Sequence, residues 1–179
     1  MEKTKQNFRA IIIDLGLETA AKYSMRNIYN AIEIGCMFKA NEGLSTYRIA
    51  QFIDEVKGQK KFISIDYKSE HIDSCKQMLF DLNPALLQNV QFFCGRSLDM
   101  LPNAMHETDL FDFVLLDGGA NPEYCLKEFE LVVRRLSENG LIIIDDLQNM
   151  VPTEAYPHPR PFGKGTLNKL VKIGIYSLL

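Results

Sequence analysis

The chain has 179 residues, of which 46% are hydrophobic and 24% charged, and its formal net charge at pH 7 is -3. This size and balance are typical of one globular domain with a sizeable core, and the negative charge argues against a nucleic-acid partner. The apolar runs are strand-sized and Met1 to Arg9 is polar, so we expect no membrane span, no signal sequence and a cytoplasmic location.

The four cysteines, Cys36, Cys75, Cys94 and Cys125, are widely spaced and include no C-x-x-C pair. This spacing argues against a zinc site. We expect buried free thiols in a reducing compartment, because free cysteine is among the most frequently buried residue types.

Apolar periodicity predicts an alternation of helices and strands along the chain. The first half is expected to contain a helix over Phe8 to Tyr23, a strand over Ala31 to Ile34, a helix over Leu44 to Val56, a strand over Phe62 to Asp66 and a helix over Glu70 to Leu82. The second half is expected to contain a strand over Val90 to Cys94, a helical turn over Ser97 to Leu101, and strands over Phe111 to Leu116 and Leu141 to Ile144.

A further helix is expected between the last two strands. Asn121 is its predicted N-cap, Pro122 its first residue, and Gly140 its left-handed C-terminal cap. The complete alternation predicts a doubly wound α/β fold, with a mostly parallel sheet covered by helices on both faces. Such sheets bind ligands outside the carboxyl ends of their strands.

Small and polar residues follow the first predicted strand. Gly35 comes directly after it, and Gly43, Ser45 and Thr46 stand at the entrance of the next helix. Glycine lets the backbone turn tightly and lets a ligand approach it. The two hydroxyl groups either cap the helix or donate to a ligand carboxylate at its N-terminus.

Polar residues also end the next two strands. Asp66 ends the second strand, where a carboxylate either accepts the two hydroxyls of a ribose or caps a helix. Gly95, Arg96 and Ser97 follow the third strand and suit the edge of an adenine, although an arginine here is more often a surface charge.

Three carboxylates are expected at the same rim, because Asp117 follows the fourth strand and Asp145 and Asp146 follow the fifth. Their mutual repulsion would raise the pKa of at least one of them. A divalent cation such as Mg²⁺ would relieve it. In the alternative interpretation, Asp117 faces a cofactor while the other two cap loops or face water.

Together these motifs resemble the class I S-adenosylmethionine-dependent methyltransferases, and the stretch from Ile32 to Leu147 is similar to their small-molecule O-methyltransferase branch. The motifs that carry the resemblance are Glu33-x-Gly35 with Gly43-x-Ser45-Thr46, Asp66, Gly95-x-Ser97, Leu116-Asp117 and Asp145-Asp146. The resemblance implies a Rossmann-like fold, S-adenosylmethionine as the methyl donor and a small molecule as the methyl acceptor. We expect neither a nucleic acid nor a membrane as a partner.

The resemblance also implies roles for particular residues. Glu33 and Gly35 would line the methionine side of the cofactor, Ser45 or Thr46 would hold its carboxylate, Asp66 its ribose and Ser97 its adenine region. The implied cofactor site further includes Met37, Gly43, Tyr67, Gly95, Arg96 and Asp117. Asp117, Asp145 and Asp146 would be the catalytic residues and the ligands of Mg²⁺ or another divalent cation.

Two departures from the family pattern concern the substrate side. Residues Cys36 to Glu42 lengthen the glycine loop, and Ala120 stands where the catechol-type enzymes have a lysine base. The acid–base step of that subgroup therefore does not carry over. Asp145, Asp146 or His158 remain as candidates for the base.

The C-terminal part is expected to differ from the family. Prolines interrupt Met150 to Phe162, which predicts a loop over the rim, and Lys169 to Leu178 would be one last strand. Since an open sheet edge invites pairing, we expect a homodimer. We predict one domain over residues 1–179, with an N-terminal helical segment (1–27), a cofactor-binding core (28–147) and a C-terminal loop and edge strand (148–179).

Two alternatives remain open at this point. A nicotinamide-dependent oxidoreductase would need G-x-G-x-x-G after the first strand, whereas Gly35 is followed by Cys36 and Met37. A non-catalytic binding or assembly module would keep the fold without turnover. Neither the acceptor nor the choice between oxygen and nitrogen is fixed by the sequence, although oxygen is the expected nucleophile.

Overall fold

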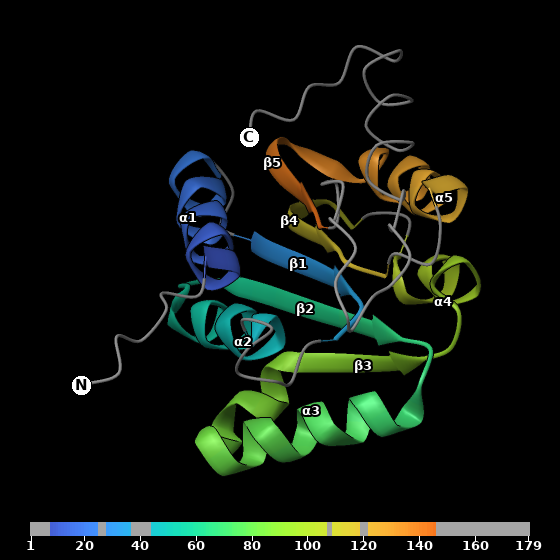
Figure 1. Ribbon diagram of the computed structural model, residues 1–179. Coiled ribbons are helices and arrows are strands. Elements are labelled where there is room, and N and C mark those ends of the chain that lie inside the picture. The colour runs from blue at the N-terminus through green and yellow to red at the C-terminus, as the bar shows by residue number, and fades with distance from the viewer. Residues whose placement is uncertain (1–7, 25–27, 37–43, 107–108, 119–121, 146–179) are drawn as a thin grey trace.

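A five-stranded parallel sheet is the framework of the protein (Figure 1). The computed structural model describes residues 8–24, 28–36, 44–106, 109–118 and 122–145. The strands are β1 (Ile28–Ile34), β2 (Gln59–Asp66), β3 (Val90–Cys94), β4 (Phe111–Leu116) and β5 (Leu136–Ile144). Their order is β3-β2-β1-β4-β5. The chain therefore builds outward from β1 on one side and returns to its other side at β4, which places the switch in strand order between β1 and β4.

Helices cover both faces of the sheet, as the alternation of elements predicts (Figure 1). One face carries α1 (Phe8–Tyr23), α2 (Ser45–Glu55), α3 (Ser69–Leu82) and the 3₁₀ helix η2 (Pro84–Asn89), and the other carries α4 (Ser97–Ala104) and α5 (Pro122–Val133). Successive residues of β1 alternate between these layers, because Ala31 packs in the first core and Ile32 in the second. The doubly wound α/β prediction is confirmed.

Helix α1 lies directly against the sheet. Ile13, Leu17 and Ala20 of this helix belong to the first core. Gly16 makes the approach close, because a Cβ atom there would lie 2.7 Å from Cδ1 of Ile143 on β5. The predicted N-terminal helix thus becomes part of the layered core.

Strand β5 begins earlier than predicted, which makes the role assigned to Gly140 wrong. Helix α5 ends at Val133, and Gly140 lies inside β5. The register of β4 against β5 shifts between Phe111 and Phe113. A Cβ at Gly140 would lie 2.7 Å from the carbonyl oxygen of Phe111, so glycine is needed for an irregular strand pair and not for a helix cap.

Three of the four free cysteines are buried as predicted, but Cys94 is exposed. It is the last residue of β3, which lies at the edge of the sheet. No helix in the described part of the chain is long and apolar enough to span a membrane. The predicted N-cap Asn121, the proline-rich loop and the last strand lie outside the described residues.

Candidate functional site

The carboxyl ends of the strands form one continuous rim, because backbone hydrogen bonds extend the sheet beyond each strand. The N–H groups of Gly35 and Gly95 donate to the carbonyls of Ile65 and Asp66, at 2.8 and 2.9 Å. On the other side, the N–H groups of Asp117 and Asp145 donate to Ile34 and Leu116, at 2.8 and 2.9 Å, respectively. The residues predicted from five strand ends therefore lie along one edge of the sheet.

The turns after β1 and β4 come closest at the switch in strand order. Gly35 has a φ of 87°, a left-handed conformation that favours glycine. A Cβ atom on Gly35 would lie 2.7 Å from the carbonyl oxygen of Asp117. Both the backbone conformation and the space exclude a side chain here, so glycine is what lets the turns after β1 and β4 approach each other at the switch in strand order.

The carboxylate of Asp66 joins the turns after β1 and β2. Its Oδ2 accepts the backbone N–H of Cys36 at 3.2 Å, and its Oδ1 accepts the N–H of Lys68 at 2.9 Å. His71 approaches the same carboxylate with Nδ1 at 3.3 Å. The side chain is only 6% exposed. The Sγ of Cys36 also lies 3.6 Å from Oδ2. Since an ionised carboxylate has about four acceptor positions, a ligand hydroxyl would replace or share one of these four contacts.

Glu33 is wholly buried and joins three elements. The hydroxyl groups of Ser45 and Thr46 at the start of α2 donate to it, the second at 2.8 Å, and that of Ser64 in β2 donates at 2.9 Å. Burial raises the pKa of Glu33 to about 7, and these hydroxyl donors oppose the shift. Leu44, directly before α2, has a φ of 53°. The Glu33 hydrogen bonds hold the helix N-terminus in place despite this strain.

A second buried carboxyl lies on the opposite face, between α4 and α5. Glu128 of α5 is 1% exposed, and its Oε1 accepts the hydroxyl of Ser97, the first residue of α4. A Cβ on Gly118 would lie 3.1 Å from Oε1 of Glu128. Glu128 therefore joins the turn after β3 to the turn after β4.

Residues 32–147 match a protein family described as a methyltransferase domain. The match covers more than half of the chain. The chain belongs to this methyltransferase family. The prediction of an S-adenosylmethionine-dependent methyltransferase is thereby confirmed, and the alternative of a nicotinamide-dependent oxidoreductase is wrong. No curated protein matches the chain significantly.

Solved structures with the same fold include three O-methyltransferase-like proteins. One is a Staphylococcus aureus protein thought to be a caffeoyl-CoA O-methyltransferase (TM-score 0.64, 20% identity, covering 91% of this chain and 72% of that one). The second is the O-methyltransferase TomG of Streptomyces achromogenes, which is involved in tomaymycin synthesis and was solved with S-adenosylmethionine (TM-score 0.64, 19% identity, covering 89% of this chain and 66% of that one). The third is a Bacillus cereus O-methyltransferase solved with S-adenosylhomocysteine (TM-score 0.62, 18% identity, covering 97% of this chain and 69% of that one). At these identities they confirm the fold, and the matches span 66% to 72% of the lengths of these three proteins.

Other predicted residues of the methyltransferase have less enclosed positions. Tyr67 is 64% exposed, with the Lys68 ammonium 5.1 Å from its ring centroid. Arg96 is exposed at the N-cap of α4, without a side-chain cap. Asp145 is half-buried after β5. The remaining predicted residues, Met37, Gly43, Asp146 and His158, lie outside the described residues.

The donor set for a metal is incomplete in the described part of the methyltransferase, which contains no group of three acidic, histidine or cysteine side chains able to hold an ion. Asp117 and Asp145 follow the neighbouring strands β4 and β5. Asp146, the third predicted ligand, lies outside the described residues. The metal therefore stays a prediction that depends on Asp146.

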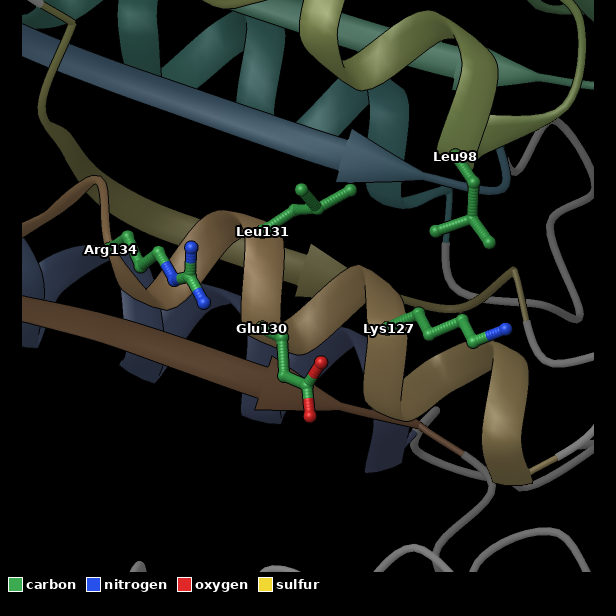
Figure 2. Close-up of a pocket in the computed structure, with 5 residues that line it drawn as sticks. All are labelled: Leu98, Lys127, Glu130, Leu131 and Arg134. Carbon is green, nitrogen blue, oxygen red and sulfur yellow. The ribbon is translucent and has the colours of Figure 1, made fainter.

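A shallow groove of about 290 Å³ lies between α4 and α5. Figure 2 shows its lining, which consists of Leu98 from α4 and Lys127, Glu130, Leu131 and Arg134 from α5 and the turn after it. None of these residues is in the predicted site. The groove is thus separate from the set of residues gathered at the strand ends.

Sequence reasoning missed two residues that organise the candidate site of the methyltransferase, Ser64 and Glu128. Ser64 lies between Ile63 and Ile65 in the apolar part of β2. Glu128 lies on the helix face that Cys125 and Val132 occupy, three and four residues away. A polar side chain at an apolar position was the signal that could have found both.

Proposed function

We propose that the chain transfers the methyl group of S-adenosylmethionine to an oxygen atom of a small molecule. The close approach of Gly35 to the carbonyl of Asp117, at the switch in strand order, carries this proposal. Doubly wound sheets bind nucleotide-like ligands in the crevice at that point. Family membership supplies the reaction class.

The predicted cofactor residues suit different parts of S-adenosylmethionine. Asp66 would accept the ribose hydroxyls, and Ser97 with Gly95 and Arg96 would face the adenine. The methionine carboxylate would lie at the N-terminus of α2, where the N-cap residue Leu44 supplies no side-chain cap and the helix dipole favours an anion. Because Ser45 and Thr46 donate to Glu33, their proposed part is to fix this N-terminus.

The reaction is a displacement at carbon. The acceptor oxygen forms a bond to the methyl carbon while the carbon–sulfur bond breaks, which leaves S-adenosylhomocysteine and releases the hydroxyl proton of the acceptor. The reactive group belongs to the cofactor, so the protein contributes mainly by positioning the two reactants and excluding water. Gly35 and Asp117 would border the cofactor on the side where the acceptor enters.

The proton of the acceptor requires a base or a cation. Asp117, Asp145 and Asp146 would hold a divalent ion such as Mg²⁺, which would lower the pKa of the acceptor hydroxyl. Without the ion, Asp145, Asp146 or His158 would take the proton. The O-methyltransferases TomG and that of Bacillus cereus are similar in fold, which supports oxygen as the nucleophile.

Binding and turnover test the proposal separately. Calorimetry should detect S-adenosylhomocysteine at one site per chain, and Asp66→Asn should weaken that binding by roughly tenfold through the loss of a charged acceptor. Asp81→Asn, an exposed change on α3, is the control. Absence of binding to the wild-type protein would refute the cofactor assignment.

Methyl transfer should then be followed by mass spectrometry with a panel of catechol-like and other phenolic acceptors. Loss of turnover after chelation, with recovery on adding Mg²⁺, would support the cation, and Asp145→Asn should then raise the Mg²⁺ concentration required. Full turnover after chelation would remove the metal from the mechanism. Binding without turnover on any acceptor would favour the non-catalytic alternative.

A further inference from the structure

Glu128 is a buried carboxyl with fewer partners than its burial demands. Its Oε1 accepts one hydrogen bond, from the hydroxyl of Ser97, whereas its Oε2 has no hydrogen-bond partner among the described residues. The side chain is 1% exposed. An ionisable group is seldom kept in such a place for stability alone, because a buried, incompletely paired polar atom costs free energy.

The hydrogen bond between Ser97 and Glu128 determines where the proton of the Ser97 hydroxyl points. A serine hydroxyl has one proton to donate and two lone pairs that accept, whereas an ionised carboxylate only accepts. Burial raises the pKa of Glu128 to about 6, so the carboxyl is ionised at pH 7.5. The single proton of Ser97 is therefore committed to Glu128, and its hydroxyl oxygen is left as an acceptor toward any other group.

Ser97 stands where that direction matters for a nucleobase. It begins α4 directly after Gly95 and Arg96, in the turn that follows β3. Gly118, two residues after β4, lies near the same carboxyl, since a Cβ built on it would be 3.1 Å from Oε1. Glu128 thus binds the first residue after the turn in which the proposed function puts the adenine, and it lies close to the turn after β4.

We propose that Glu128 is a positioning residue that makes the cofactor site selective for a 6-aminopurine, by holding the Ser97 hydroxyl as an acceptor for the exocyclic amino group. This inference rests on the proposed function. The adenine amino group donates to such an acceptor. A hypoxanthine carbonyl at the same place sets two acceptors against each other and is disfavoured.

The test compares two ligands that differ at that position, S-adenosylhomocysteine and S-inosylhomocysteine, by calorimetry at pH 7.5. The wild-type protein should bind the adenosyl compound roughly tenfold more tightly, as expected for one hydrogen bond. Glu128→Gln should reduce this preference by at least about fivefold. Its carboxamide is able to donate to the Ser97 oxygen, which a carboxylate cannot do, so the hydroxyl proton is no longer committed to residue 128.

The matched control is Glu130→Gln, which removes the same charge from an exposed position on the same helix and should keep the full preference. Ser97→Ala should lose the preference, and Ser97→Thr, which retains a hydroxyl, should keep it. These two variants decide the matter if circular dichroism shows that Glu128→Gln does not fold. A purely structural role would weaken both ligands equally and leave their ratio unchanged.

Two results would overturn the inference while leaving the proposed function standing. One is equal wild-type affinity for the two ligands, and the other is an undiminished preference in either folded variant, Glu128→Gln or Ser97→Ala. A wild-type protein that binds neither ligand would overturn the proposed function and this inference together.

Discussion

Glu33 and Gly35, two residues apart at the end of β1, show how single side chains shape the rim. Glu33 points into the first core and receives three hydroxyl hydrogen bonds from α2 and β2. Gly35 has no side chain, and the carbonyl of Asp117 occupies the space that one would need. One residue therefore fixes the neighbouring elements, and the other lets the turns after β1 and β4 pack closely together.

The stability of the protein should depend on pH through Glu33. Its folded pKa of about 7 lies above the reference value of 4.5, so the folded state binds the proton more tightly. Its contribution is complete below pH 4.5 and is lost as the pH rises through 7. Urea unfolding should show the wild-type free energy falling relative to Glu33→Gln between pH 5 and 7.5, by an amount on the order of 3 kcal/mol.

Glu130→Gln, an exposed carboxyl change, should show the same pH dependence as the wild type. If Glu33→Gln and the wild type follow parallel curves over this range, Glu33 is not the titrating group.

Gly35→Ala should separate backbone strain from crowding at the crevice. The control is Gly58→Ala, because Gly58 also has a positive φ of 98° but precedes β2, at the opposite end of the sheet. Gly58→Ala should cost about 1–2 kcal/mol of unfolding free energy through strain, and Gly35→Ala should cost more, because its Cβ would also lie 2.7 Å from the carbonyl oxygen of Asp117. Only Gly35→Ala should also weaken S-adenosylhomocysteine binding, by roughly tenfold or more, in calorimetry. Equal affinity in the two variants would contradict the assigned role of Gly35.

At the scale of elements, α1 is joined to the sheet by a close contact and not only by its apolar side chains. Gly16 has no side chain, and a Cβ built on it would lie 2.7 Å from a side-chain atom of Ile143 in β5. The same Cβ would lie 3.1 Å from Phe113 of β4 and 3.3 Å from Leu141 of β5. Glycine weakens a helix on its own. Here it permits a helix-to-sheet distance that the core requires.

Gly16→Ala should therefore destabilise the protein, although the same change stabilises an ordinary exposed helix by about 1 kcal/mol. We expect a loss of about 1–3 kcal/mol in urea unfolding because of overpacking. Adding Ile143→Val, which removes the Cδ1 atom in the way, should recover part of the loss. Leu15→Ala, at an exposed position of α1, should be nearly neutral. A stabilised Gly16→Ala would mean that α1 lies farther from the sheet.

At the scale of the whole molecule, the strand order gathers distant segments at one rim. Gly35, Asp66, Gly95, Asp117 and Asp145 lie up to 110 residues apart in the sequence, yet each follows or ends a strand of one sheet. A ligand in the crevice would contact segments on both sides of the switch. Its binding should therefore stabilise the folded chain as a unit.

S-adenosylhomocysteine at about one hundred times its dissociation constant should raise the unfolding free energy by about 2.7 kcal/mol. Differential scanning calorimetry at several ligand concentrations would measure this, with adenosine alone as the weaker comparison. Gly35→Ala should shift its transition much less at the same ligand concentration. A transition temperature independent of ligand would argue for a module that has lost the cofactor.

The sequence predicted the elements most accurately where a regular apolar pattern extends over a whole element. The predicted boundaries of α1, β3 and β4 agree with the structure, because periodicity and local propensity point to the same elements. Gly140 was misplaced because a glycine between apolar segments suits a helix cap as well as a strand irregularity. The side chain of Leu136 and the carbonyl of Phe111, which distinguish the two, approach it only in the folded chain.

The fold and the reaction class were determined by the sequence alone, since both depend on the order of strands, helices and short motifs along the chain. The partners of individual side chains were decided only by the tertiary structure. Ser45 and Thr46 donate to Glu33, and Ser97 donates to Glu128. The sequence motifs did not predict any of these three hydrogen bonds. The physical reason is that a hydroxyl bonds the nearest buried acceptor, and proximity across 12 to 31 residues arises only when the sheet and its helices pack together.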